Sequence, residues 1–114
     1  MNSNRVKRAI GLAGITLLIC TIYLLWNSTV SGAGFPLDDS WIHQTFARNL
    51  AETGRWEYVR GEPAAGSTSP LWTMLLAAGH LLKIDPTVWA FTLGIAGLIL
   101  TVIFCDALWS TFQP

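Results

Sequence analysis

Apolar and uncharged positions are gathered into three runs along the chain. The first, residues 9–26, reads AIGLAGITLLICTIYLLW. A helix of that length measures about 27 Å, close to the thickness of the hydrocarbon core of a bilayer. The third run, residues 86–105, is equally apolar, and Asp85-Pro86 forms a typical helix start of acidic N-cap and proline. The pattern predicts transmembrane helices over residues 9–26 and 86–105.

The first run has an alternative reading as a cleavable signal peptide. Ser31-Gly32-Ala33 loosely resembles a cleavage site for such a peptide. The apolar run is, however, longer than the roughly 7–15 residues that are usual in a signal peptide. The length favours an uncleaved membrane anchor.

The middle run, residues 70–82, is less apolar than the other two, and the helix predicted from it covers residues 70–84. It has five leucines but also contains His80, so its insertion into a membrane is marginal unless neighbouring helices support it. Ser69-Pro70 is a suitable helix start. We expect a transmembrane helix here as well, which makes the chain an all-α membrane protein with three transmembrane helices.

The segment between the first two runs, residues 27–69, predicts a loop that carries a helix of its own. Ile42, Phe46 and Leu50 recur at i, i+4 and i+8 within residues 38–53, DDSWIHQTFARNLAET. We expect this amphipathic helix to lie beside the membrane with its apolar stripe on the lipid. Residues 56–59 are expected to be extended, and residues 60–63 to form a turn.

The basic residues indicate the orientation of these elements. Arg5, Lys7 and Arg8 precede the first run without an acidic residue, so residues 1–8 are expected in the cytoplasm. With three spans, the loop 27–69 is extracytoplasmic, Lys83 returns to the cytoplasm and Asp106 is again outside. The sequence therefore predicts a multi-pass protein of the plasma membrane.

Composition agrees with a membrane protein. Of 114 residues, 52% are hydrophobic and 12% are charged, whereas a soluble domain has about 25% charged residues. The formal net charge is zero, so charge gives no sign of a nucleic-acid partner. Cys20 and Cys105 both fall within apolar runs, where a thiol usually packs as a small apolar group.

Several loop elements follow one another in a recognisable order. The acidic pair Asp38-Asp39 is followed by residues 46–52, FARNLAE, then by Gly61-Glu62-Pro63 and by residues 66–72, GSTSPLW. This order resembles the N-terminal end of polytopic glycosyltransferases of the GT-C class. The resemblance is greatest to the bacterial branch with the dolichyl-phosphate-mannose-protein mannosyltransferase-like and arabinofuranosyltransferase-like proteins.

The resemblance implies an inverting transfer of a sugar from a polyprenyl-phosphate carrier to an acceptor glycan or protein outside the membrane. It assigns the role of catalytic base to Asp38, with Asp39 beside it as a second catalytic carboxylate. A carboxylate suits this role because the acceptor hydroxyl must lose a proton as it attacks. An ordinary helix N-cap at Asp38 is the alternative.

Family members have many more membrane helices than three. The chain is therefore expected to correspond to an N-terminal portion, with residues 106–114 as a truncated end, and to be inactive alone. The rival interpretation is a small non-catalytic membrane protein that acts as a scaffold or subunit.

Three further residues are expected to bind substrate: Arg48, His43 and Arg60. Arginine binds phosphate through two hydrogen bonds, although pairing with nearby glutamates is the alternative. Asp39 and His43 are four residues apart on one helix face, but two candidate ligands do not make a metal site. We therefore predict no metal and no cofactor. His80 is expected to be a packed residue.

Overall fold

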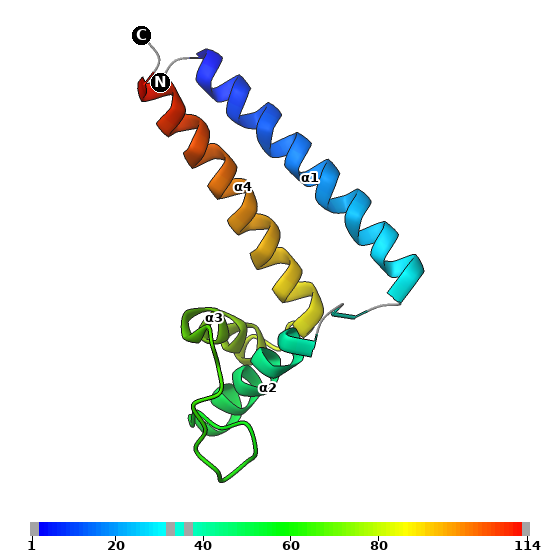
Figure 1. The fold of residues 1–114 in the computed structure, drawn as a ribbon, viewed down its shortest axis with the longest axis vertical. Helices are drawn as coiled ribbons and strands as arrows, with labels where there is room; N and C mark the ends of the chain where they lie inside the picture. Colours follow the sequence, from blue (N-terminus) through cyan, green and yellow to red (C-terminus); the bar gives the residue numbers. More distant parts are fainter. Residues whose placement is uncertain (1–2, 32–33, 36–37, 113–114) are drawn as a thin grey trace. The chain divides into compact units, whose positions relative to one another are not determined.

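The computed structural model describes residues 3–31, 34–35 and 38–112. Four helices lie in these ranges: α1 (Ser3–Ser31), α2 (Asp38–Thr53), α3 (Pro70–Leu81) and α4 (Pro86–Phe112) (Figure 1). Gly32 and Ala33 of the cleavage site considered above lie outside the described residues. The chain divides into two units, unit 1 with residues 1–32 and 92–114, and unit 2 with residues 33–91.

Two helices are long and apolar enough to cross a membrane. They are Val6–Val30 of α1 and the whole of α4, with mean hydropathies of 2.1 and 2.3. Only 6% of each helix's most apolar stretch is buried, unlike the core helix of a soluble protein. The described residues thus form an all-helical protein with two candidate membrane-spanning helices.

Within unit 1, an ion pair joins α1 to α4. Arg8 Nη2 lies 2.6 Å from Asp106 Oδ1, and Arg8 Nε donates to Asp106 Oδ2 at 3.0 Å. Arg8 is near the start of α1 and Asp106 near the end of α4, so the two helices run antiparallel. The three-span prediction separates these residues by the membrane, and the structure differs from it in this respect.

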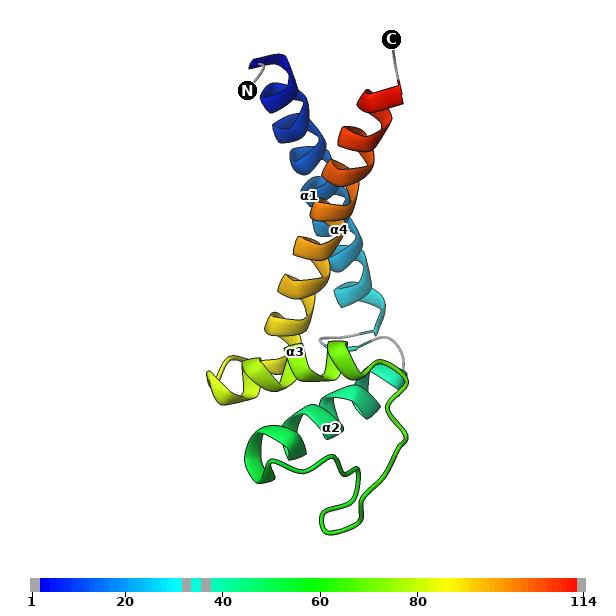
Figure 2. The same ribbon diagram turned by 90° about the vertical axis from the view of Figure 1, so that its left-hand side faces the viewer.

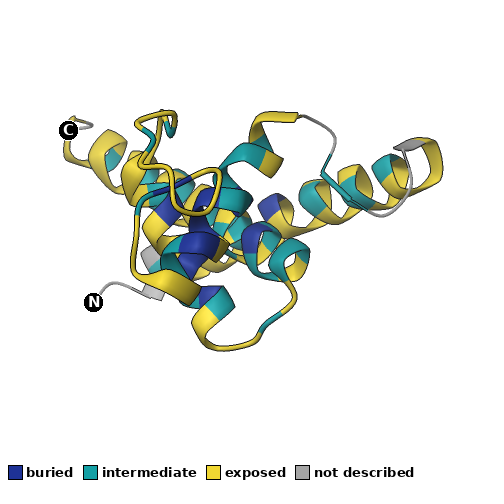
Figure 3. Cartoon of the chain, turned by 90° about the horizontal axis from the view of Figure 1, so that it is seen from below, coloured by how far each residue is buried: buried dark blue, intermediate teal, exposed yellow. Residues whose placement is uncertain are grey.

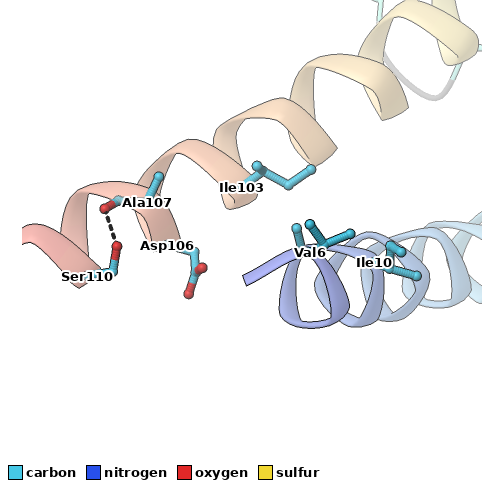
Figure 4. A pocket seen from close by; sticks show the side chains of 7 residues that line it. Val6, Ile10, Ile103, Asp106, Ala107 and Ser110 are labelled. Carbon is cyan, nitrogen blue, oxygen red and sulfur yellow. Dashed lines mark hydrogen bonds between the residues drawn. The ribbon is translucent and has the colours of Figure 1, made fainter. Parts of the chain in front are cut away.

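A mainly apolar groove of about 440 Å³ lies beside the ion pair in unit 1. Figure 4 shows Val6 and Ile10 of α1 on one side of the groove and Ile103 and Ala107 of α4 on the other. Asp106 contributes the carboxylate at its edge. The groove therefore offers a hydrocarbon lining with one charged group.

Unit 2 is built on the contact between α2 and α3, which cross each other (Figure 2). Phe46 and Ala47 of α2 and Leu76 and Ala77 of α3 are buried. Figure 3 shows the buried parts of the chain in dark blue. Burying these apolar side chains against each other removes them from water and stabilises the pair. Four polar or charged side chains among the described residues of unit 2 are also buried: Gln44, Asn49, Glu57 and Thr73.

The expected transmembrane helix over residues 70–84 is not one of the two candidate spans. α3 has 12 residues, about 18 Å of helix, whereas a hydrocarbon core is about 30 Å thick. One of its faces is also occupied by α2. The apolar run therefore contains a short helix that packs against α2 of the same chain.

α2 has the bounds expected from the sequence, but Phe46 in its apolar stripe faces the interior of unit 2. Phe46 is 1% exposed and packs inside unit 2, where the rings of Trp56 and Tyr58 lie 5.8 and 5.6 Å from its ring centre. Trp41, by contrast, is 52% exposed. Phe46 therefore contacts protein, in place of the lipid expected from the periodicity.

The end of α3 is a Schellman motif. Ile84 N–H donates to the Gly79 carbonyl at 3.0 Å, and Lys83 N–H donates to the His80 carbonyl at 3.1 Å. This geometry requires a left-handed residue, and Lys83 supplies it with φ of 56°. Glycine is the usual residue at that position because a side chain is strained there.

The start of α4 is capped as the sequence predicts. The Asp85 carboxylate accepts hydrogen bonds from Thr87 N–H and Val88 N–H at 2.9 and 3.0 Å. Pro86 occupies the first helical position. At the start of α3, Pro70 is likewise the first residue, but the Ser69 hydroxyl makes no capping hydrogen bond.

Candidate functional site

The acidic pair lies in the first turn of α2. Both Asp38 and Asp39 are exposed. Within residues 34–35 and 38–112, neither carboxylate makes a hydrogen bond or an ion pair with a side chain. The free N–H groups and the dipole at a helix start favour negative charge there, which accounts for two adjacent carboxylates in one turn. The arrangement leaves two carboxylates available to a molecule from outside.

His43 lies one turn further along α2, but its contacts lead into unit 2. Its Nδ1 is 3.2 Å from both the Ser67 and the Thr73 hydroxyl oxygens, and those two oxygens are 2.8 Å apart. Thr73 is completely buried. The three side chains join α2, α3 and the segment before α3, so His43 has a role in packing.

This cluster differs from a hydrolase triad. A catalytic histidine is normally oriented by a carboxylate on its second nitrogen while the first faces the nucleophile. In the described part of the chain, His43 is bonded to two hydroxyls and to no carboxylate. The three side chains form hydrogen bonds with one another. Among the described residues, the cluster lacks the carboxylate that would orient the histidine for nucleophilic catalysis.

The two arginines assigned to substrate binding have different surroundings. The Arg60 guanidinium forms an ion pair with Glu52, as the glutamate alternative in the sequence allows. Arg48 is exposed on α2. Arg60 must leave Glu52 before it can bind a phosphate, whereas Arg48 is not held by any described carboxylate.

A second polar contact joins α2 to α3 through His80. Its Nε2 is 3.0 Å from Gln44 Oε1, and Gln44 Nε2 donates to the Pro86 carbonyl at 3.2 Å. Because an amide oxygen can only accept, Nε2 carries the proton. Burial lowers the pKa of His80, the positive charge of Arg48 lowers it further, and Glu52 partly opposes the decrease. His80 is therefore a neutral, packed side chain near pH 7.

The turn after α2 contains a buried carboxylate that sequence reasoning missed. Glu57 is 2% exposed, and its carboxylate accepts from the Thr53 hydroxyl at 3.2 Å and from Gly61 N–H at 2.9 Å. Asn49 Nδ2 donates to the backbone carbonyls of Glu57 and Tyr58 at 3.0 and 2.9 Å. Gly61 has a φ of 88° in this turn. Its presence in the sequence indicated a turn, but it did not indicate that the Glu57 carboxylate would bind the Gly61 N–H.

No group of three or more His, Cys, Asp or Glu side chains that could hold a metal ion occurs in residues 3–31, 34–35 and 38–112. Cys20 and Cys105 are free thiols. The pair Asp39 and His43 gains no third ligand from another described element.

Comparison with known proteins gives no match: no protein-family model, no curated protein and no solved structure resembles the chain closely enough to identify it.

Proposed function

We propose that the chain is the N-terminal portion of a membrane glycosyltransferase that uses a polyprenyl-phosphate-linked sugar. The order of loop elements from Asp38 to Trp72 supports the proposal through its resemblance to the GT-C class. The observation that carries it is the pair of exposed carboxylates in the first turn of α2, in a segment between two candidate membrane-spanning helices. A lipid-linked donor and an acceptor outside the membrane would meet at such a position.

In the proposed reaction, Asp38 accepts the proton of an acceptor hydroxyl. The hydroxyl oxygen forms a bond to the anomeric carbon while the bond from that carbon to the phosphate oxygen of the carrier breaks. Attack from the face opposite the phosphate inverts the anomeric centre. Asp39 positions the acceptor, and Arg48 is available to contact the departing phosphate.

We further propose two membrane spans with both ends of the chain in the cytoplasm. Arg5, Lys7 and Arg8 favour a cytoplasmic start, and the antiparallel Arg8–Asp106 pair favours the same side for the end of α4. The segment with α2 and α3 is then extracytoplasmic. A green fluorescent protein fused after Pro114 should fluoresce, and alkaline phosphatase fused there should be inactive. The reverse result would support three spans.

The catalytic role is tested by Asp38→Asn. Asparagine caps a helix about as well as aspartate but accepts no proton at neutral pH. The test uses membranes of the source cell, which supply any further segments that the reaction requires. Sugar transfer should fall by about 10²–10⁴, the usual effect of losing a positioned base, with an unchanged amount of protein in the membrane. Asp39→Asn should cost less.

A non-catalytic scaffold or subunit is the second candidate, and the engagement of His43 and Arg60 within unit 2 favours it. Under this interpretation, full transfer activity persists in Asp38→Asn, whereas deleting the chain reduces the activity of the complex that it supports. Retained activity in the Asn variant would thus remove Asp38 from the reaction.

A further inference from the structure

α3 has an apolar face that no described residue covers. Its members recur at i, i+3, i+4, i+7, i+10 and i+11, which is one stripe of a helix continued just past its end. All of them are exposed except the i+7 residue, which is partly buried. Leu71, Met74 and Leu81 are 72%, 56% and 67% exposed. The stripe consists of Leu71, Met74, Leu75, Ala78, Leu81 and Leu82, and contains no polar residue.

The opposite face of α3 is bound to α2. Thr73, Leu76 and Ala77 are buried there, and His80 makes its hydrogen bond to Gln44 from the same side. α2 therefore cannot cover the stripe without breaking these contacts. A third side of α3 is occupied by Trp89 of α4, which lies against Gly79.

The stripe belongs to a helix that is held beside the start of a candidate membrane span. Only the four residues 82–85 separate α3 from α4. Trp89 lies in the first turn of α4, and its indole Nε1 donates to the Leu75 carbonyl at 2.8 Å. Pro86 is the first residue of this candidate span. A span that enters the bilayer at Pro86 would hold α3 at the level where water meets hydrocarbon.

An aromatic cluster in unit 2 gives a second indication of this level. Phe35 lies 5.1 Å from Trp41 and 5.9 Å from Phe91, measured between ring centres. Phe91 is in the second turn of α4, and Trp41 is half exposed. Exposed tryptophan and tyrosine side chains gather at membrane–water interfaces because their rings are amphipathic, and Trp41 is such a side chain.

The charged side chains on the two packed helices of unit 2 complete the pattern. Asp38, Asp39, Arg48 and Glu52 are all exposed, and all of them are on α2, the helix bound to the other face of α3. Of the two helices, α2 thus carries exposed charges, whereas α3 has no acidic residue, lysine or arginine. This is the distribution of a helix pair that rests on a membrane, with α3 below and α2 above.

We propose that the stripe of α3 is a membrane-docking surface, and that α3 lies in the outer leaflet of the bilayer that α1 and α4 cross. Its occupant is lipid hydrocarbon at the interface. The proposal rests on the two-span arrangement but not on sugar transfer. It also exchanges the expected roles of the two helices, since α3 contacts lipid and α2 is carried above it.

The test measures the surroundings of spin labels on the full chain in vesicles of phosphatidylcholine and phosphatidylglycerol. Cys20 and Cys105 are first replaced by alanine, and single cysteines are then placed by Met74→Cys or Leu81→Cys on the stripe. Arg48→Cys is the matched control, because it is also an exposed position but lies on α2. Oxygen concentrates in lipid and a charged nickel chelate in water, so the ratio of their collision rates reports depth.

The stripe labels should show a several-fold higher ratio of oxygen to nickel collisions than the Arg48 label. Equal ratios at the three positions would overturn the proposal by placing the stripe in water. Low collision rates with both reagents at Met74 would overturn it by showing a protein cover. Dipolar broadening that disappears on dilution with unlabelled chain would identify that cover as a second copy. Because no outcome depends on catalysis, failure here leaves the role of Asp38 untouched.

Discussion

Trp89 lies directly on Gly79. A Cβ atom built on Gly79 would be 2.2 Å from the indole Cδ1 and 2.5 Å from Cγ, well inside any normal contact. The absence of a side chain at residue 79 is what allows the indole to reach the Leu75 carbonyl. This contact joins α3 to the first turn of α4.

Replacing Gly79 by alanine should therefore disrupt the contact between α3 and α4. The indole cannot yield at its far end only, because Cγ is also too close, so the whole side chain must move. A cost of about 1–3 kcal/mol is typical of such overpacking. Hydrogen–deuterium exchange of α3 in the full chain should become faster.

Gly94→Ala is the matched control, because it lies in α4 and a Cβ there meets nothing within 4 Å. It should leave exchange in α3 unchanged. Equal protection of α3 in wild type and Gly79→Ala would contradict the close contact.

Unit 2 should lose stability as the pH falls below 6.5. The unfolded chain binds a proton at His80 near pH 6.5, the ordinary value, whereas burial and Arg48 lower the pKa in the folded state. Below pH 6.5 the unfolded state therefore binds more protons, and stability falls until folded His80 is protonated too. Above that pH, this contribution is complete.

The pH effect can be measured by hydrogen exchange of α3 amides at a series of pH values, corrected for intrinsic exchange. His80→Asn should flatten the decline, and His43→Gln should keep it. A decline of equal size in His80→Asn would assign it to another group.

Lys83→Gly should stabilise unit 2. Lys83 has φ of 56° at the end of α3, a conformation that costs a residue with a side chain about 1–2 kcal/mol. Glycine adopts it without that strain but loses more entropy on folding, so the net gain should be about 1 kcal/mol. The midpoint of thermal unfolding of the chain in detergent should rise. An unchanged midpoint in Lys83→Gly, together with an unchanged midpoint in Lys83→Ala, would show that the position carries no strain.

Asn49→Ala should release the turn after α2. It removes both hydrogen bonds to the carbonyls of Glu57 and Tyr58, and each is worth about 1 kcal/mol, with a further cost for leaving buried carbonyls unpaired. Trypsin should then cleave faster after Arg55 and Arg60. Thr45→Ala is the control, because among the described residues its hydroxyl bonds only to the Trp41 carbonyl in the same helix. Equal cleavage rates in the two variants would show that Asn49 does not hold the turn.

Local signals in the sequence identified where helices begin. Asp85-Pro86 predicts the start of α4, and residues 38–53 coincide with α2, because capping and periodicity depend on neighbouring residues alone. The acidic pair was placed at a helix start for the same reason. Hydropathy could not reveal what α3 packs against, since a lipid and a protein partner both select leucine. Thr73 and His80, seven residues apart on one face, were the available sign of a polar contact.

Contacts between residues far apart in the sequence could not be predicted from these local signals. Arg8 and Asp106 are 98 residues apart, and the partners of His43 are 24 and 30 residues away. Such pairs depend on how the helices pack, which neither periodicity nor composition specifies. This is why the contact between Arg8 and Asp106 and the hydroxyl partners of His43 could not be predicted from the sequence.

The two faces of α3 should also differ in how readily they vary among related sequences. Lipid accepts any apolar side chain, so leucine, isoleucine, valine and methionine should exchange freely at Leu71, Met74 and Leu81. Few other residues could form the hydrogen bonds of Thr73 or fit beneath Trp89 at Gly79, so these two residues should vary little. An alignment of relatives would then show variability that rises and falls with the 3.6-residue period of the helix while hydropathy stays nearly level on the stripe. The pattern of substitutions in α3 would therefore indicate which side of the helix lies in the membrane.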